Sequence, residues 1–138
     1  MSSGCNASYN LVMPCCAEEM ETTVEKIIFL ISRHECQIED IIFRVEMACK
    51  EMLANAVEHG CISADEEIMI YLKTGKNQVS VSVKDPGEGF DWESFNFDMM
   101  PLLKERGRGL CMINTAADEV YFNDRGNKIT ARFVHRGW

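Results

Sequence analysis

The sequence predicts an α/β two-layer sandwich, in which helices cover one face of a mixed, mostly antiparallel sheet. Two segments in the first half carry apolar residues at helical spacing, and several shorter segments alternate apolar and polar residues as half-buried strands do. At 138 residues the chain is predicted to form one domain over 1–138, with an ordered core of about 9–134.

Two amphipathic helices are predicted in the first half of the chain. The first covers residues 17–34, where apolar side chains recur every three or four positions from Met20 to Ile31. The second has a longer apolar stripe from Ile38 to Ala56, and Gly60 stands where a C-terminal glycine is expected.

The remaining segments complete the predicted sheet. Pro14 ends a short edge strand. A third, short helix covers residues 109–117, whereas residues 85–108 show no clear period and are predicted to be a functional lid. The predicted strands are residues 9–13, a hairpin of 68–72 and 79–83 joined across 74–77, and a final hairpin of 120–122 and 129–133 joined across 124–127.

The charge of the chain argues against a polyanionic partner. A formal net charge of −8 at pH 7 repels nucleic acid and anionic membrane surfaces. No segment is apolar and long enough for a transmembrane helix, and the first residues lack the pattern of a secretory signal, so a cytoplasmic location is expected. Lys104, Arg106 and Arg108 form a local basic cluster that can compensate an anionic ligand.

The seven cysteines are expected to be reduced thiols, because their number is odd and no CxxC pair occurs. A zinc site from the His34-x-Cys36 and His59-x-Cys61 pairs is the disfavoured alternative. Cys49 and Cys111 lie in apolar helical patterns and are predicted to be small buried hydrophobes.

A polar pair on the second predicted helix is the first candidate site. Glu51 and Asn55 are four residues apart, so they share one face of the helix, where they can hold a water and a divalent cation. A solvated helix edge is the ordinary explanation for such a pair. His59 lies one turn further on and is predicted to cap the helix or support the site, and Glu46 is a less favoured base.

Two glycine-rich boxes follow in the sequence. Asp85-Pro-Gly87-Glu-Gly89-Phe90 places a carboxylate at the end of a strand and then lets the backbone approach a ligand. The Asp85 carboxylate can accept a hydrogen bond from the exocyclic amine of adenine. Gly107-Arg108-Gly109 precedes Leu110, where the third helix is predicted to begin with free backbone N–H groups that can bind phosphate.

The order and spacing of these boxes resemble the GHKL ATPase superfamily, whose nucleotide-binding fold is called the Bergerat fold, and within it the anti-sigma-factor serine/threonine kinases. The resemblance implies ATP and Mg²⁺ as cofactors and residues 85–109 as the ATP lid. It assigns Glu51 as the catalytic base or water-orienting group and Asn55 as a Mg²⁺ ligand. The residues that it implies for nucleotide binding are Asn55, Asp85, Gly87, Gly89, Gly107, Arg108, Gly109, Leu110 and Thr130.

The sequence leaves two features of the lid open. The Arg108 side chain departs from the commonest family pattern, and both a phosphate contact and a solvated arginine are consistent with it. Four aromatic residues in the lid are explained either by packing onto the body of the domain or by a partner-binding patch. They are Phe90, Trp92, Phe95 and Phe97.

The resemblance implies a protein kinase that phosphorylates an anti-anti-sigma (STAS-type) protein, binds a sigma factor and forms a homodimer, without contacting nucleic acid or membrane directly. Two alternatives remain. One is a nucleotide-gated binding module that transfers no phosphate. The other is a detached histidine-kinase catalytic domain, because Arg33-His34-Glu35 superficially resembles a phosphoacceptor box, although the preceding helical hairpin is missing.

Overall fold

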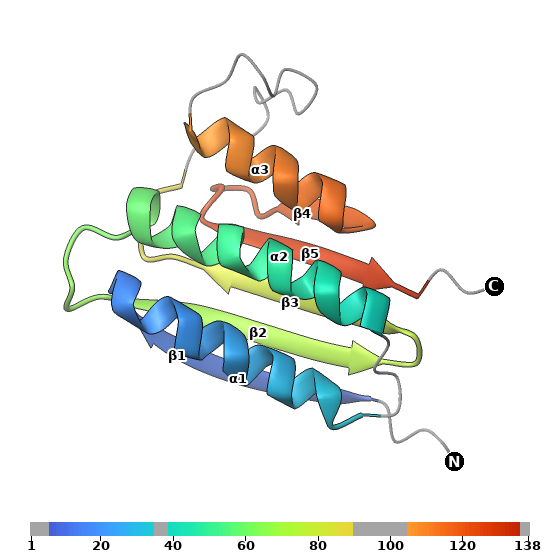
Figure 1. Cartoon of the computed structure of the whole chain (residues 1–138). Coiled ribbons are helices and arrows are strands. Elements are labelled where there is room, and N and C mark those ends of the chain that lie inside the picture. Colours follow the sequence, from blue (N-terminus) through green and yellow to red (C-terminus); the bar gives the residue numbers. More distant parts are fainter. Residues whose placement is uncertain (1–5, 35–38, 90–104, 136–138) are drawn as a thin grey trace.

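The computed structural model describes residues 6–34, 39–89 and 105–135 of the chain. Within these residues, three helices cover one face of a five-stranded sheet (Figure 1). The predicted two-layer architecture is therefore confirmed. In chain order the elements are β1 (Ala7–Pro14), a 3₁₀ turn (Ala17–Glu19), α1 (Met20–Ser32), α2 (Glu39–Asn55), a π-helical turn (Ala56–Gly60), β2 (Glu67–Gly75), β3 (Gln78–Lys84), α3 (Glu105–Ala116), β4 (Glu119–Phe122) and β5 (Lys128–Val134).

The described strands pair antiparallel at every contact, in the order β1-β2-β3-β5-β4, so the predicted mixed sheet is wrong in this respect. The reason is visible between β1 and β2 (Figure 1). The helices α1 and α2 run in opposite directions, so the chain returns to the end of the sheet at which β1 finished. Strand β2 then enters the sheet opposite to β1, and no parallel pair forms.

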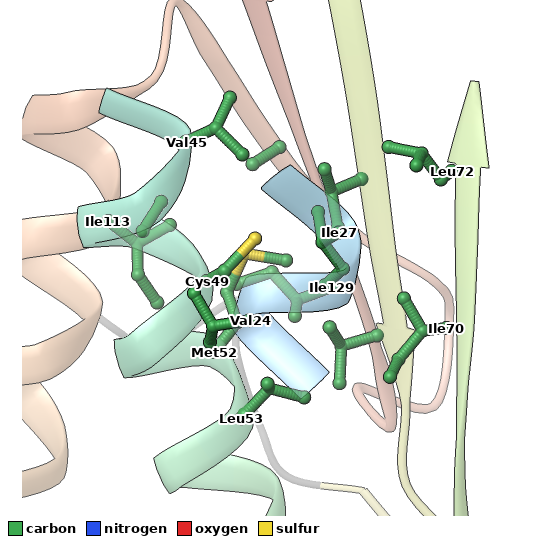
Figure 2. Close-up of a cluster of buried hydrophobic side chains, with 14 of the residues drawn as sticks. Val24, Ile27, Val45, Cys49, Met52, Leu53, Ile70, Leu72, Ile113 and Ile129 are labelled. Carbon is green, nitrogen blue, oxygen red and sulfur yellow. The ribbon is translucent and has the colours of Figure 1, made fainter. Parts of the chain in front are cut away.

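The hydrophobic core lies between the sheet and the helices, as the alternation of the strands predicts. Ile70 opposes Val83 across the β2–β3 pair, and both side chains are buried beneath the helices. Val24 and Ile27 of α1 and Met52 of α2 pack over this face (Figure 2). The other face of the sheet carries mostly polar side chains.

A buried arginine that sequence reasoning missed joins α2 to the C-terminal part of the fold. The Arg44 guanidinium donates hydrogen bonds to the Asp40 carboxylate at 2.9 Å and to the Asp118 carboxylate at 3.0 Å. It also donates to the carbonyl oxygens of Ala116 at 3.3 Å and Val134 at 2.8 Å. Burial of a charge is tolerated when it is paired and hydrogen-bonded in this way. Arg44 therefore holds α2 against the ends of α3 and β5.

The prediction that all cysteines are reduced thiols is wrong for two of them. Cys15 and Cys61, which are 46 positions apart in the sequence, form a disulfide. The sequence could not pair them, because their proximity depends on how β1 packs beside the end of α2. Cys49 and Cys111 are buried, as predicted, and burial raises the pKa of the Cys49 thiol to about 12. In the described part of the chain, no helix is long and apolar enough to cross a membrane.

Three element ends differ from the predictions. α2 continues as a π-helical turn to Gly60, which has no positive φ and so is not a left-handed C-terminal glycine. The β2–β3 strands extend further, so that the loop is only residues 76–77, with Asn77 at φ 58°. α3 begins at Glu105 instead of near Leu110, which places Gly107 and Gly109 inside the helix.

Candidate functional site

Glu51 and Asn55 lie on the last turns of α2 beside α3. Both side chains are half-buried. A Cβ atom added to Gly109 would lie 2.9 Å from Glu51 Oε1 and 3.6 Å from Asn55 Nδ2. These distances show that α3 approaches both polar side chains closely at Gly109. The predicted pair shares one face, and that face points toward α3.

The Asn55 amide has an unusual environment. Its Nδ2 atom is buried and has no hydrogen-bond partner among the described residues. Leaving such a group unpaired costs about 1–3 kcal/mol. The oxygen and nitrogen of an amide are assigned from their partners, so a reversed amide would leave the oxygen unpaired at the same place. In either orientation the site fits a ligand that supplies a partner to Asn55.

The Asp85 turn follows β3 and packs against the end of α2. The Asp85 backbone N–H donates to the Asn127 carbonyl at 2.9 Å, and Asp85 Oδ1 accepts the Gly87 N–H at 2.8 Å. A Cβ at Gly60 would lie 2.5 Å from Asp85 Oδ1, and one at Gly87 would lie 2.8 Å from the Gly60 carbonyl oxygen. Glycines at positions 60 and 87 are thus what allow this approach.

The rest of the turn is supported by the β4–β5 loop. Gly89 has φ 96°, a conformation that favours glycine, and a side chain there would clash with the Arg125 carbonyl. Asn127 Nδ2 lies 3.4 Å from the carbonyl oxygens of both Asp85 and Gly87. Sequence reasoning missed Asn127. Its only signal was its place in a polar turn between two strands.

A small cavity collects several of the predicted residues. Asn55, Asp85 and Leu110 line it together, and Asn127 and Ile129 complete the wall near the β4–β5 loop. The other lining residues are Met52, Ala56, Val83, Phe122, Gly126 and Lys128. A largely apolar wall with a few convergent polar groups is typical of a small-molecule site.

The cavity is small. The space open to the centre of a water-sized sphere is about 20 Å³, which is enough for about one water molecule. A purine base is much larger than a water molecule. Binding such a ligand therefore requires the lining, of which Leu110 on α3 is one part, to move outward.

Thr130 does not join these residues, contrary to the assignment implied by the resemblance. Neighbouring side chains of a strand point to opposite faces, and in β5 it is Ile129 that faces the cavity. Thr130 lies on the sheet face without helices, where its hydroxyl is 2.7 Å from the Ser82 hydroxyl. Ile129 and Thr130 are adjacent in β5, so moving the assignment by one residue along the strand moves it to the other face of the sheet.

The other polar residues of the second helix lie apart from the cavity. The π-helical turn after Asn55 adds a residue to the turn and moves His59 off the line of Glu51 and Asn55. The His59 imidazole lies 3.8 Å from the Glu58 carboxylate. Glu46 lies 3.5 Å from Lys50, in an ion pair along α2.

Several predicted residues of the lid lie outside the part of the chain that the structure describes. The aromatic residues Phe90, Trp92, Phe95 and Phe97, together with Lys104, lie outside the described residues. Gly107 and Arg108 belong to α3 by their backbone. The Arg106 and Arg108 side chains lie outside what the structure describes, so the basic cluster remains a prediction.

Comparison with known proteins identifies related domains. A model of the histidine kinase-like ATPase domain matches residues 17–133. The chain is 28% identical to the serine-protein kinase RsbW of Halalkalibacterium halodurans, over 72% of this chain and 64% of that protein. It therefore spans slightly less than two thirds of that relative.

A solved structure supports the same fold. The structure of the RsbU and RsbW domains of Rv1364c from Mycobacterium tuberculosis matches with a TM-score of 0.64 at 20% identity. The match covers 94% of this chain and 32% of that one. At this level of identity the likeness concerns the fold alone.

Proposed function

This chain belongs to the histidine kinase-like ATPase family, and we propose that it is an ATP-dependent serine/threonine protein kinase of the anti-sigma-factor type. The observation that carries the proposal is the Asn55 side chain, whose buried Nδ2 has no hydrogen-bond partner among the described residues and which lines one cavity together with Asp85. The similarity to a relative named a serine-protein kinase supports the choice of reaction. The substrate and partners are part of the proposal.

The proposed nucleotide site assigns a role to each cavity residue. The Asp85 carboxylate accepts a hydrogen bond from the adenine amine, and Ile129 and Leu110 contact the base. Asn55 offers its side-chain oxygen to Mg²⁺, which takes only one or two protein oxygens and completes its shell with phosphates and water. The bound Mg²⁺ would neutralise part of the phosphate charge. Gly107, Arg108 and Gly109 remain proposed phosphate-binding residues.

Glu51 is proposed as the base of the transfer. The acceptor hydroxyl oxygen forms a bond to the γ-phosphorus, the bond from that phosphorus to the bridging oxygen of ADP breaks, and the hydroxyl proton passes to the Glu51 carboxylate. Glu51 lies one helical turn from Asn55, which keeps the base near the proposed nucleotide without placing it in the cavity wall. Positioning of this kind is most of what phosphoryl transfer needs from a protein.

The proposed partners follow from the same family resemblance. A STAS-type anti-anti-sigma protein supplies the acceptor serine or threonine, and a sigma factor is the second partner. Phosphate adds about two negative charges at the docked hydroxyl, and repulsion by an acidic protein then favours release. We also propose a homodimer, which is supported by the position of β1 at the edge of the sheet.

The histidine-kinase alternative has less support in the structure. His34 Nε2 lies 2.7 Å from the Tyr9 hydroxyl, and the two rings are tilted by 55° with their centroids 5.8 Å apart, which gives His34 a local structural partner just after α1. The binding-module alternative predicts that ATP binds without leaving phosphate on a partner. The same experiment separates all three functions.

The test is incubation of the protein with ATP labelled at the γ-phosphate and a purified STAS-type protein. Acid-stable label on serine or threonine is expected. Asn55→Ala should lose Mg²⁺-dependent ATP binding, whereas Glu51→Ala should bind ATP and transfer phosphate about 100-fold more slowly or worse. Glu39→Ala changes an exposed glutamate of the same helix that lines neither the cavity nor the groove between α1 and α2, so this matched control should transfer normally. Acid-labile label, or no label with an intact complex, would reject the proposal.

A further inference from the structure

A second hollow lies on the outer surface of the helix layer, between α1 and α2. It holds about 510 Å³, and its apolar residues include Met20 and Val24 from α1 and Ala54 from α2. Val24 is buried and Met20 and Ala54 are half-buried. This groove is therefore much larger than the cavity that contains Asp85, and it opens on a different side of α2.

Glu51 connects the groove to the candidate site. It lines the groove, whereas Asn55, one turn later, lines the cavity. Glu51 also lies against Gly109 of α3, because a Cβ atom added to Gly109 would be 2.9 Å from Glu51 Oε1. A chain segment lying in the groove would therefore reach the proposed base from outside the cavity. An acceptor hydroxyl has to approach from outside the cavity if ATP occupies it.

The rim of the groove is acidic. Glu21 and Glu25 come from α1, and Glu46 and Glu51 come from α2; among the described lining residues, Lys50 is the single basic one. Lys50 is already paired with Glu46. Among the described residues, no ion pair is found for Glu21 or Glu25, which are four residues apart on α1. Like charges at this spacing destabilise a helix slightly, and a cation supplied by a partner would remove that cost.

We propose that this groove binds the acceptor segment of the protein substrate, and that Glu21 and Glu25 select a segment with basic residues beside the phosphorylated serine or threonine. The inference rests on the proposed kinase function and adds the chemistry of the substrate. The apolar floor holds the segment, the glutamates bind its lysines or arginines, and Glu51 faces its hydroxyl.

The test compares two synthetic peptides that differ only in the residues around one serine. One has two arginines on each side and the other has two glutamates. Fluorescence anisotropy should show that the arginine peptide binds at least about tenfold more tightly, which two exposed charge pairs can supply. High salt should remove most of the difference.

Charge reversal locates the binding surface. Glu21→Lys/Glu25→Lys should reverse the preference between the peptides and leave ATP affinity unchanged. The milder pair Glu21→Gln/Glu25→Gln should abolish the preference, which keeps the test valid if the reversed variant folds poorly. Asp65→Lys/Glu67→Lys makes the same change in charge at exposed residues that do not line the groove. This control should keep the wild-type preference.

Two outcomes would overturn the inference: equal binding of the peptides, or a preference that the Glu21/Glu25 variants do not alter. Neither outcome touches the kinase proposal, which is judged by labelled phosphate on the STAS-type protein. Conversely, groove-dependent peptide binding without phosphate transfer would leave the docking surface standing and reject the kinase function. The two failures are therefore distinguishable.

Discussion

Gly60 offers a direct test of how the end of α2 positions Asp85. The Gly60→Ala substitution adds one methyl group, and its carbon would lie 2.5 Å from both Cβ and Oδ1 of Asp85. Asp85 cannot retreat freely, because its N–H is bonded to the Asn127 carbonyl and its Oδ1 accepts the Gly87 N–H. Either the carboxylate rotates away or the π-helical turn shifts outward.

Both responses have a measurable cost. Overpacking of a well-packed site costs about 1–3 kcal/mol of the free energy of unfolding. A displaced carboxylate also loses its hydrogen bond to adenine, worth about 1.5–3 kcal/mol for a charged group, so the ATP dissociation constant should rise roughly 10- to 150-fold. Urea unfolding followed by circular dichroism measures the first effect, and titration calorimetry with ATP measures the second.

Gly75→Ala is the matched control. Its added Cβ would meet only side-chain atoms of Asn6 and Gln78, at 3.4 Å, and these side chains can move. This variant should keep ATP affinity and nearly all of its stability. If Gly60→Ala unfolds and binds ATP as the wild type does, the close approach of Gly60 to Asp85 does not support the site, and the reasoning is refuted.

Three further predictions follow from the structure and the proposed function. Asp85→Asn should weaken ATP binding by about 1.5–3 kcal/mol in calorimetry, and wild-type affinity would remove Asp85 from the site. Cys15→Ala opens a disulfide that joins residues 46 positions apart, and loop-closure entropy predicts a loss of about 4 kcal/mol in urea unfolding under non-reducing conditions. Cys16→Ala is its control, and an equal loss there would contradict the assignment of Cys15 to the bond. Light scattering at micromolar concentration should show a dimer, and a monomer with and without nucleotide would count against the proposed pairing.

The sequence predicted most of the secondary structure. A helix or strand that buries one face has apolar residues at a regular spacing, and this spacing is visible in the sequence. The stripe along α2 and the alternation of β2 and β3 both reflect contact with the same core. The spacing of Glu51 and Asn55 correctly placed them on one helical face. Asn55, Asp85 and Leu110, which the resemblance assigns to nucleotide binding, line one cavity although they come from different elements.

Other features depend on how elements distant in the sequence pack together. A local pattern of apolar residues carries no information about that packing. The Cys15–Cys61 bond arises because the end of β1 lies beside the end of α2. Thr130 was assigned to the site and lies on the opposite sheet face, because strand register decides which neighbour points inward. Gly60 looked like a helix-ending glycine and is instead the point where Asp85 approaches.

The amino-acid sequence by itself determined the order of the helices and strands and the chemical groups available to the site. Only the tertiary structure decided that the Nδ2 atom of Asn55 is buried with no partner among the described residues, and that Glu51 lines the acidic groove one helical turn from the cavity. The physical reason is that the environment of a side chain depends on what packs across from it. For Asn55 and Glu51 that neighbour is α3, which lies some fifty residues away in the sequence and is brought there by the packing of the core.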